Sequence, residues 1–150
     1  MKKNFFSIIL PSYNRAHKIS KALNSVINQS YQNWELIIID NFSTDKTEQL
    51  IKSYNNKKFF FYKINNNGVI AKSRNLGIKN AKAKWIAFLD SDDIWYLDKL
   101  SRILELTDNN FDIICSNEYR HDLKGGVKMP LYHNLKSNNF YKELLLKGNA

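Results

Sequence analysis

Acidic side chains follow a short apolar run near the middle of this 150-residue chain. The run is Trp85–Leu89 (WIAFL), and the residues directly after it are Asp90, Ser91, Asp92 and Asp93. In an extended segment, the side chains of Asp90 and Asp92 would project to the same face. Carboxylate oxygens are ligands that Mg²⁺ and Mn²⁺ prefer, commonly together with oxygens of a substrate phosphate. The pattern therefore predicts a divalent-metal site that takes a phosphorylated substrate.

Two further segments place aromatic, basic and acidic side chains directly after apolar runs. The run Phe5–Leu10 is followed by residues 11–15 (PSYNR), and the run Trp34–Asp40 (WELIIID) ends in a carboxylate and is followed by Asn41. An arginine can bind an anionic group, an aromatic ring can stack on a planar ring, and a carboxylate can accept a hydrogen bond. Each feature also has an ordinary structural explanation: a surface ring, a helix-capping acid, or an acidic helix start that suits the helix dipole.

Apolar periodicity indicates the elements that must position these residues. Continuous apolar or β-prone runs predict strands at Phe5–Leu10, Trp34–Asp40, Phe59–Ile64, Trp85–Leu89 and Asp112–Ser116. Three-and-four spacing predicts helices between them: about four turns from Ile19, one carrying Thr47–Tyr54, a weaker one over Val69–Ala83 with Ala71, Ile78 and Ala81 inward, and one carrying Leu97–Leu104.

Alternating strands and helices with short connections predict an α/β fold, a mostly parallel sheet with helices on both faces. Right-handed crossovers place the carboxyl ends of all parallel strands at one edge, which is where open α/β sheets bind ligands. The polar segments after the apolar runs then meet at that edge. Chance seldom gathers a ring, an arginine and several carboxylates in one place, so the structural explanation is weaker for the group than for any member.

The last part of the chain has a looser pattern. Glu118–His121 and Gly125–Met129 could pair as a hairpin, and Phe140–Leu146 could form a helix. We find no linker and no repeat, so we expect residues 1–150 to form a single domain. The lone Cys115 excludes an internal disulfide and lies in an apolar run, where we expect it to be buried.

The net charge of +9 favours an anionic partner. The excess is uneven, because residues 1–75 carry +8 and residues 76–150 carry +1. Such a field suits nucleic acid, an acidic membrane surface or a phosphorylated small molecule, although lysine is also an ordinary solubilising residue. The nucleic-acid interpretation is the weakest, because no nucleic-acid-binding motif is present and the acids at the functional edge would repel phosphates without a metal.

The amino terminus resembles a signal peptide for only a few residues. Pro11 ends its apolar run, no small-residue cleavage site follows, and no stretch approaches the roughly 18 apolar residues of a membrane span. We therefore expect a cytoplasmic protein, and the basic half also allows peripheral association with the cytoplasmic face of the inner membrane. Dinucleotide-binding, phosphate-loop, serine-hydrolase and zinc-protease motifs are all absent.

Three blocks of this sequence together resemble a known family. They are IILPSYNR, WELIIIDNFSTD and GVIAKSRNLGIKNAKAKWIAFLDSDD, and they span about Phe6 to Leu100. In order and spacing they are similar to the family-2 glycosyltransferases of the GT-A fold. The resemblance implies a metal-dependent, inverting hexosyltransferase-type enzyme of bacterial surface-glycan or polysaccharide synthesis. It would transfer a sugar from a nucleotide diphosphate, usually a UDP-sugar, to a saccharide or lipid-linked acceptor, with Mn²⁺ or Mg²⁺ as cofactor.

The resemblance also implies roles for individual residues. In the family, the positions of Pro11, Tyr13 and Arg15 line the nucleotide pocket, and Tyr13 would stack on the base. The position of Asp40 accepts a hydrogen bond from uracil, and Lys72 lies near the position that contacts ribose or diphosphate. Asp90, with its neighbour Ser91, would meet the ribose, and Asp92 would ligate the metal. The first two blocks and the third would thus together form the donor site.

The chain departs from the family pattern at two places. Asn41 stands where a second acid is common, and residues 144–150 (LLLKGNA) look like the start of a further family segment. No residue matches the general base, which we expect to lie beyond Ala150. We therefore expect the chain to be a donor-binding part, truncated before the acceptor-binding part and inactive in transfer by itself. A non-catalytic nucleotide-sugar-binding module is the alternative.

Overall fold

The computed structural model describes residues 5–109 and 111–116, together with two short strands at residues 120–121 and 127–128. By its internal contacts the chain divides into two compact units, Met1–Asp108 and Asn109–Ala150. All the candidate site residues lie in the first unit. Whether the whole chain behaves as one domain stays a prediction.

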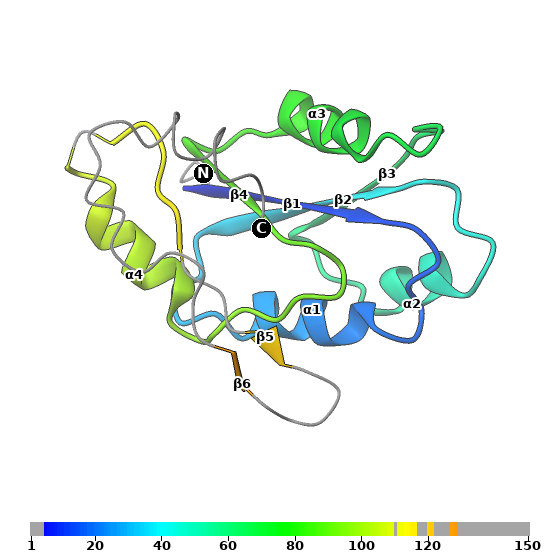
Figure 1. Ribbon diagram of the computed structural model, residues 1–150, viewed down its shortest axis with the longest axis horizontal. Coiled ribbons are helices and arrows are strands. Elements are labelled where there is room, and N and C mark those ends of the chain that lie inside the picture. Colours follow the sequence, from blue (N-terminus) through cyan, green and yellow to red (C-terminus); the bar gives the residue numbers. More distant parts are fainter. Residues whose placement is uncertain (1–4, 110, 117–119, 122–126, 129–150) are drawn as a thin grey trace. The chain divides into compact units, whose positions relative to one another are not determined.

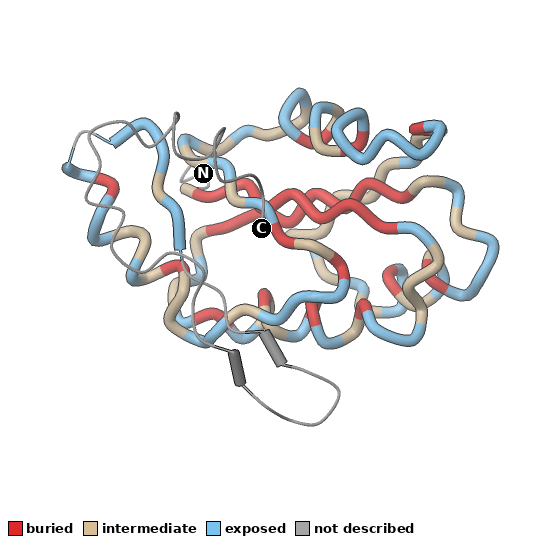
Figure 2. The backbone as a smooth tube through the Cα atoms, viewed as in Figure 1, coloured by how far each residue is buried: buried red, intermediate tan, exposed pale blue. Residues whose placement is uncertain are grey.

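The first unit is built on a parallel sheet, as the sequence predicts. Its strands are β1 (Phe6–Ser12), β2 (Trp34–Asp40), β3 (Phe59–Lys63) and β4 (Trp85–Phe88). Their order is β3-β2-β1-β4, and every neighbouring pair is parallel (Figure 1). The two central strands are buried along their whole length (Figure 2). All four carboxyl ends therefore meet at one edge.

Helices cover both faces of this sheet, which confirms the predicted architecture. The helices are α1 (Ile19–Ile27), α2 (Thr47–Ser53), α3 (Ile70–Asn80) and α4 (Lys99–Leu106). Figure 1 shows α3 over one face, with α1 and α2 below the other. The nine residues of α1 make two and a half turns, fewer than the four expected. The buried cluster on its side of the sheet includes Phe6, Ile8, Leu10, Ile19, Leu23, Val26, Trp34, Leu36, Ile38, Ile51 and Leu100.

Strand β1 continues two residues past the predicted end at Leu10, through Pro11 to Ser12. Pro11 has no N–H group, which usually excludes proline from a central strand. The carbonyl of Ile9 accepts from Leu89, so residues 9 and 11 direct their backbone polar groups toward β4. The pairing with β4 reaches only Ile9, so Pro11 lies just past the end of that ladder.

Strand β4 differs from the buried strand that the sequence predicts. Its residues alternate between partly buried and exposed, and Ile86 and Phe88 lie on the exposed side. Within the described residues β4 pairs only with β1, which makes it an edge strand of this sheet. A continuous apolar run predicts burial on both faces, and here one face is open.

The predicted inward face of α3 is wrong. Ala71 and Ile78 are exposed and Ala81 lies outside the helix, whereas the buried residues are Ser73 and Gly77. A Cβ atom at Gly77 would lie 2.5 Å from Cγ2 of Ile9 on β1. The helix therefore approaches the sheet through small residues, which apolar periodicity does not reveal.

Predictions for the segments after β4 also need correction. The fourth predicted helix starts at Lys99, and Leu97, expected on its apolar stripe, is exposed. In the second unit, Asp112–Ser116 is not a strand and Cys115 is exposed rather than buried.

The predicted hairpin is confirmed in part. Strands β5 (Arg120–His121) and β6 (Val127–Lys128) pair antiparallel within the second unit. The predicted helix at Phe140–Leu146 lies outside the described residues. No described helix is long and apolar enough to cross a membrane.

A buried carboxylate fixes the connection between α3 and β4. Glu35 on β2 is 2% exposed, and its Oε1 accepts hydrogen bonds from the Ser7 hydroxyl at 2.6 Å and the Lys82 N–H at 2.8 Å. The Ser7 Oγ in turn accepts from the N–H of Ala83 at 3.0 Å. This network therefore holds the chain just before β4, which leads to Asp90.

We expect Glu35→Gln to lower the free energy of unfolding by about 1 kcal/mol. The glutamine oxygen can accept the same two hydrogen bonds, but a neutral acceptor binds them less strongly than a carboxylate. Urea unfolding followed by circular dichroism measures the change. The exposed Glu105→Gln is the matched control, and equal stability of the two variants would contradict the role of the network.

Candidate functional site

The carboxyl ends of the strands bring the predicted segments together. Ser12 at the end of β1 pairs in register with Asp40 at the end of β2, which pairs with Lys63 at the end of β3. The acids that begin at Asp90 follow β4 on the other side of β1. The sheet order therefore places the Tyr13 loop between the two acidic segments.

Side chains tie the loop after β1 to the loop after β2. The backbone N–H groups of Asn14, Arg15 and Ala16 donate to Ser43 Oγ, Thr47 Oγ1 and Asp45 Oδ2 at 2.9, 2.8 and 3.1 Å. In return, the Thr44 N–H donates to Asn14 Oδ1 at 2.8 Å. These bonds fix the backbone that carries Tyr13 and Arg15.

Asp45 also bonds to the first residue of α2. Its carboxylate accepts hydrogen bonds from the N–H and the hydroxyl of Thr47. The hydroxyl bond in particular holds the pKa of Asp45 below its usual value. The Asp45 carboxylate therefore ties Thr47, the first residue of α2, to the loop before the helix.

The carboxylate of Asp40 is buried and already hydrogen-bonded. Asp40 is fully buried, its Oδ2 accepts from the Ser43 N–H at 2.8 Å, and its Oδ1 accepts from the Ser43 hydroxyl at 2.5 Å. A carboxylate can accept about four hydrogen bonds, so further acceptor capacity remains. Because Asp40 is completely buried, a base could use that capacity only if neighbouring groups move. The predicted contact with uracil stays a prediction.

Asn41, which stands where an acid is common in the family, joins the end of β2 to the segment before α3. Its Oδ1 accepts the Asn66 N–H at 2.9 Å, and Asn66 Nδ2 donates to Ser73 Oγ at 2.9 Å. These contacts place the first turns of α3, and with them Arg74, beside the strand edge.

Asp90 is paired with an arginine that the sequence analysis did not select. Arg74 Nη2 lies 2.8 Å from Asp90 Oδ1, and the guanidinium carbon lies 5.9 Å from the centre of the Phe88 ring. Arg74 lies two residues after Lys72, which is exposed and at the start of α3. Arg74 could have been found from the sequence, because it is a basic residue one turn inside the helix, next to the small residues Ser73 and Gly77.

Asp92 lies in a turn rather than in an extended segment. The Asp93 N–H donates to the carbonyl of Asp90 at 3.1 Å, so the premise of the same-face argument for Asp90 and Asp92 is wrong. The nearest cation is Arg15, whose Nη2 lies 3.8 Å from Asp92 Oδ2. That distance is too long for a hydrogen bond. Within the described residues, Asp92 therefore holds a partner only loosely.

The remaining predicted residues have different environments. Tyr13 is 53% exposed at the end of β1, Pro11 is buried inside the strand, and Ser91 is 6% exposed. An exposed ring is available to a ligand, whereas Pro11 and Ser91 shape the backbone beside it. Of the predicted set, Tyr13, Lys72 and Asp92 are exposed and Arg15 and Asp90 are partly exposed, whereas Pro11, Asp40 and Ser91 are buried.

The carboxylate oxygens at this edge suit a hard divalent cation as ligands. Asp92 has an exposed carboxylate with no hydrogen bond among the described residues, and the exposed Asp93 follows it. Carboxylate oxygens with open access for substrate oxygens match the preference of Mg²⁺ and Mn²⁺. No group of three or more metal-binding side chains occurs in the described part of the chain, so a cation would need ligand oxygens as well.

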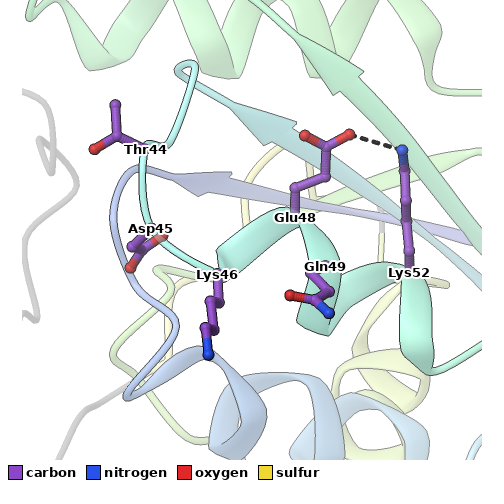
Figure 3. A pocket seen from close by; sticks show the side chains of 6 residues that line it. All are labelled: Thr44, Asp45, Lys46, Glu48, Gln49 and Lys52. Atoms are coloured by element: carbon purple, nitrogen blue, oxygen red, sulfur yellow. Dashed lines mark ion pairs between the residues drawn. The ribbon is translucent and has the colours of Figure 1, made fainter.

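A surface depression elsewhere has a different lining. Figure 3 shows its lining side chains, which come from α2 and the loop before it. Lys52 and Lys63 both pair with Glu48 and lower the pKa of its carboxyl group. The exposed acids after β4 do not line this depression.

Comparison with known proteins gives the family and the fold of this chain. The family model "Glycosyl transferase family 2" matches residues 7–150. An Escherichia coli relative named UDP-Glc:alpha-D-GlcNAc-diphosphoundecaprenol beta-1,3-glucosyltransferase WfgD is 38% identical over 112 residues, which is 74% of this chain and 44% of that protein. The chain spans between 20% and 51% of the length of the curated relatives it matches.

Solved structures agree on the fold. Staphylococcus aureus TarS 1–349 in complex with UDP has a TM-score of 0.67 and 32% identity, covering 70% of this chain and 32% of that one. The mannosyltransferase PcManGT of Pyrobaculum calidifontis, in complex with GDP-Man and Mn²⁺, has a TM-score of 0.64 at 22% identity over 72% of this chain and 34% of that one. The GT-A fold and the family match agree with the resemblance seen in the sequence, and the chain belongs to glycosyltransferase family 2.

Proposed function

We propose that this chain is the donor-binding part of an inverting, metal-dependent glycosyltransferase that uses a UDP-sugar. The observation that carries the proposal is the placing of two carboxylates and two arginines at one strand edge: Asp90 lies 2.8 Å from Arg74, and the exposed Asp92 lies 3.8 Å from Arg15. Arginines and carboxylates at one edge, beside the exposed ring of Tyr13, suit a ligand that has both a diphosphate and a planar base.

Buried polar atoms without partners support a ligand at this edge. Within the described residues, Ser12 Oγ and Arg74 Nε are buried and have no hydrogen-bond partner. An unpaired buried polar atom costs about 1–3 kcal/mol, so such atoms are uncommon unless something else binds them. Ser12 ends β1 directly before Tyr13, and Arg74 contacts Asp90, so both atoms lie where the donor would bind.

Each side chain has a distinct task in this proposal. Tyr13 stacks on the base, Asp90 accepts a hydrogen bond from a ribose hydroxyl, and Arg15 binds an oxygen of the diphosphate. Asp92 would hold the divalent cation, which neutralises diphosphate charge and so makes the nucleotide a better leaving group. Arg74 positions the Asp90 carboxylate through the 2.8 Å ion pair.

Transfer needs one more group, a carboxylate that takes the proton from the acceptor hydroxyl as its oxygen attacks the anomeric carbon. Attack comes from the face opposite the diphosphate, which inverts the configuration at that carbon. We assign no residue of this chain to that task. For the acceptor of the whole protein we propose a saccharide or a lipid-linked saccharide, by similarity to WfgD.

We expect the wild-type chain to bind UDP at least about tenfold more tightly with Mn²⁺ than with EDTA, equivalent to about 1.4 kcal/mol. The reason is that the diphosphate would otherwise face the carboxylates of Asp90 and Asp92 directly. Isothermal titration calorimetry measures both affinities. In Asp92→Asn the advantage of Mn²⁺ should shrink.

The exposed Glu105→Gln is the control for the loss of one surface charge, and it should keep the full effect of Mn²⁺. Equal UDP affinity with Mn²⁺ and EDTA in the wild type would argue against the metal. A chain that binds UDP but never releases sugar from UDP-sugars would favour the non-catalytic binding module.

A further inference from the structure

Phe42 has a backbone conformation that does not suit its side chain. Its φ is +52°, in the left-handed region that sterically disfavours residues with a Cβ atom. The other described non-glycine residues with positive φ are all asparagines: Asn14, Asn55 and Asn67. Asparagine tolerates this region because its short side chain bonds locally, whereas a bulky aromatic residue there is an outlier. Glycine would adopt this backbone conformation with less strain than phenylalanine.

Packing does not explain why phenylalanine occupies the position. Phe42 is 54% exposed and does not belong to the buried cluster of the sheet. The Nζ of Lys63, at the end of β3, lies 5.7 Å from the centre of its ring. Exposed cation–ring contacts of this kind contribute little to stability. The strain is therefore retained without a compensating gain in the core.

The position of Phe42 relates it to the donor site. It follows Asp40 and Asn41 at the end of β2, and Ser43 directly after it donates both hydrogen bonds to the Asp40 carboxylate. Lys63, which the ring contacts, is the register partner of Asp40 on β3. Tyr13 follows β1, on the opposite side of β2 from β3. Two exposed aromatic rings thus flank the end of β2.

We propose that Phe42 supplies a second aromatic surface for the base of the donor nucleotide, on the β3 side of Asp40. This inference rests on the proposed function, because it needs a nucleotide at this edge. Backbone strain at exposed residues is commonly retained where it serves a ligand. The left-handed conformation of Phe42 turns the chain away from the direction of β2. The hydrogen bonds between Ser43 and Asp40 hold this turn in place.

The test compares the wild type with Phe42→Gly and Phe42→Leu, using UDP and UMP with Mn²⁺ in calorimetry and thermal unfolding. Phe42→Gly relieves the strain, so its Tm should rise by roughly 1–4 °C. Its affinity for UDP should nevertheless fall about 5-fold to 100-fold, the range expected when one base loses an aromatic partner. Phe42→Leu keeps the strain and loses the ring, so its affinity should fall without a gain in Tm.

Asn55→Gly is the matched control, because it changes another positive φ in the turn between α2 and β3, at the opposite edge of the sheet. It should leave UDP binding unchanged. The loss in Phe42→Gly should be equal for UMP and UDP, since the ring acts on the base, whereas Arg15→Ala should weaken UDP more than UMP.

The possible failures are distinct. A Phe42→Gly variant that is more stable and binds UDP as tightly as the wild type overturns the assignment of Phe42 alone. A loss for UDP without a loss for UMP also overturns it, because the ring would then act on the diphosphate. A wild-type chain that binds none of UDP, GDP and dTDP overturns both the proposed function and this inference.

Discussion

A Gly77→Val variant is expected to lose about 3 kcal/mol of unfolding free energy, the upper part of the usual range for overpacking a close contact. Even a bare Cβ at this position would lie 2.5 Å from Cγ2 of Ile9, and Ile9 is completely buried in a central strand. Because Ile9 is buried on all sides, either its side chain must repack or α3 must shift away from the sheet. Urea unfolding of the two proteins measures the loss.

Lys79→Val is the control for this variant, because it places the same β-branched residue at an exposed position of the same helix. It reports the cost of valine in a helix without any clash, which is below about 1 kcal/mol. If Gly77→Val were no less stable than Lys79→Val, the close approach of α3 to β1 would be wrong. A shift of α3 would also move Arg74 away from Asp90, so the variant should bind UDP more weakly.

Asp40→Ala is expected to lower the free energy of unfolding by about 3 kcal/mol, because the N–H and the hydroxyl of Ser43 both lose a charged acceptor in a buried place. If Asp40 also accepts from the base, UDP affinity should fall by about 1–3 kcal/mol as well. Urea unfolding and calorimetry measure the two losses separately.

Ser43→Ala distinguishes the structural role of Asp40 from the binding role. It removes one of the two hydrogen bonds and leaves the Asp40 carboxylate in place, so stability should fall by about 1 kcal/mol. Because the hydroxyl no longer occupies Oδ1, UDP affinity should be kept or improved if uracil binds there. Unchanged UDP affinity in a folded Asp40→Ala variant would show that Asp40 only shapes the loop.

The sequence predicted the sheet well because its strands carry strong signals. The bounds of β2 agree with the prediction at Trp34–Asp40, since the β-prone apolar residues of this segment are too few for a helix. The same holds for the meeting of the acidic segments at one edge, which follows from parallel pairing alone.

The prediction failed where close packing depends on small residues. The inward face of α3 consists of Ser73 and Gly77, which lack the hydropathy that periodicity analysis detects. For the same reason Arg74, between them in the sequence, was passed over in favour of Lys72. The ion pair between Arg74 and Asp90 depends on how closely α3 approaches the sheet, and the residue pattern does not encode that separation.

Local hydrogen bonds in the loops after the strands also limited what the sequence could predict at Asp40 and Asp92. A strand that ends in a carboxylate gives no sign that the next loop will return and bond to it, as Ser43 does. Likewise the residue pattern Asp-Ser-Asp-Asp fits both an extended segment and a turn, and the bond from Asp93 to Asp90 selects the turn.

The bonds between the loops after β1 and β2 have a consequence for amide hydrogen exchange. The N–H groups of Asn14, Arg15, Ala16 and Thr44 lie in loops, yet each donates to a side-chain oxygen across the gap between the two segments. Their amide protons should therefore exchange with solvent deuterium at rates closer to those of strand residues than of loop residues. The conformational entropy of this backbone is lost when the protein folds, so a ligand arriving at the edge has little of it left to remove.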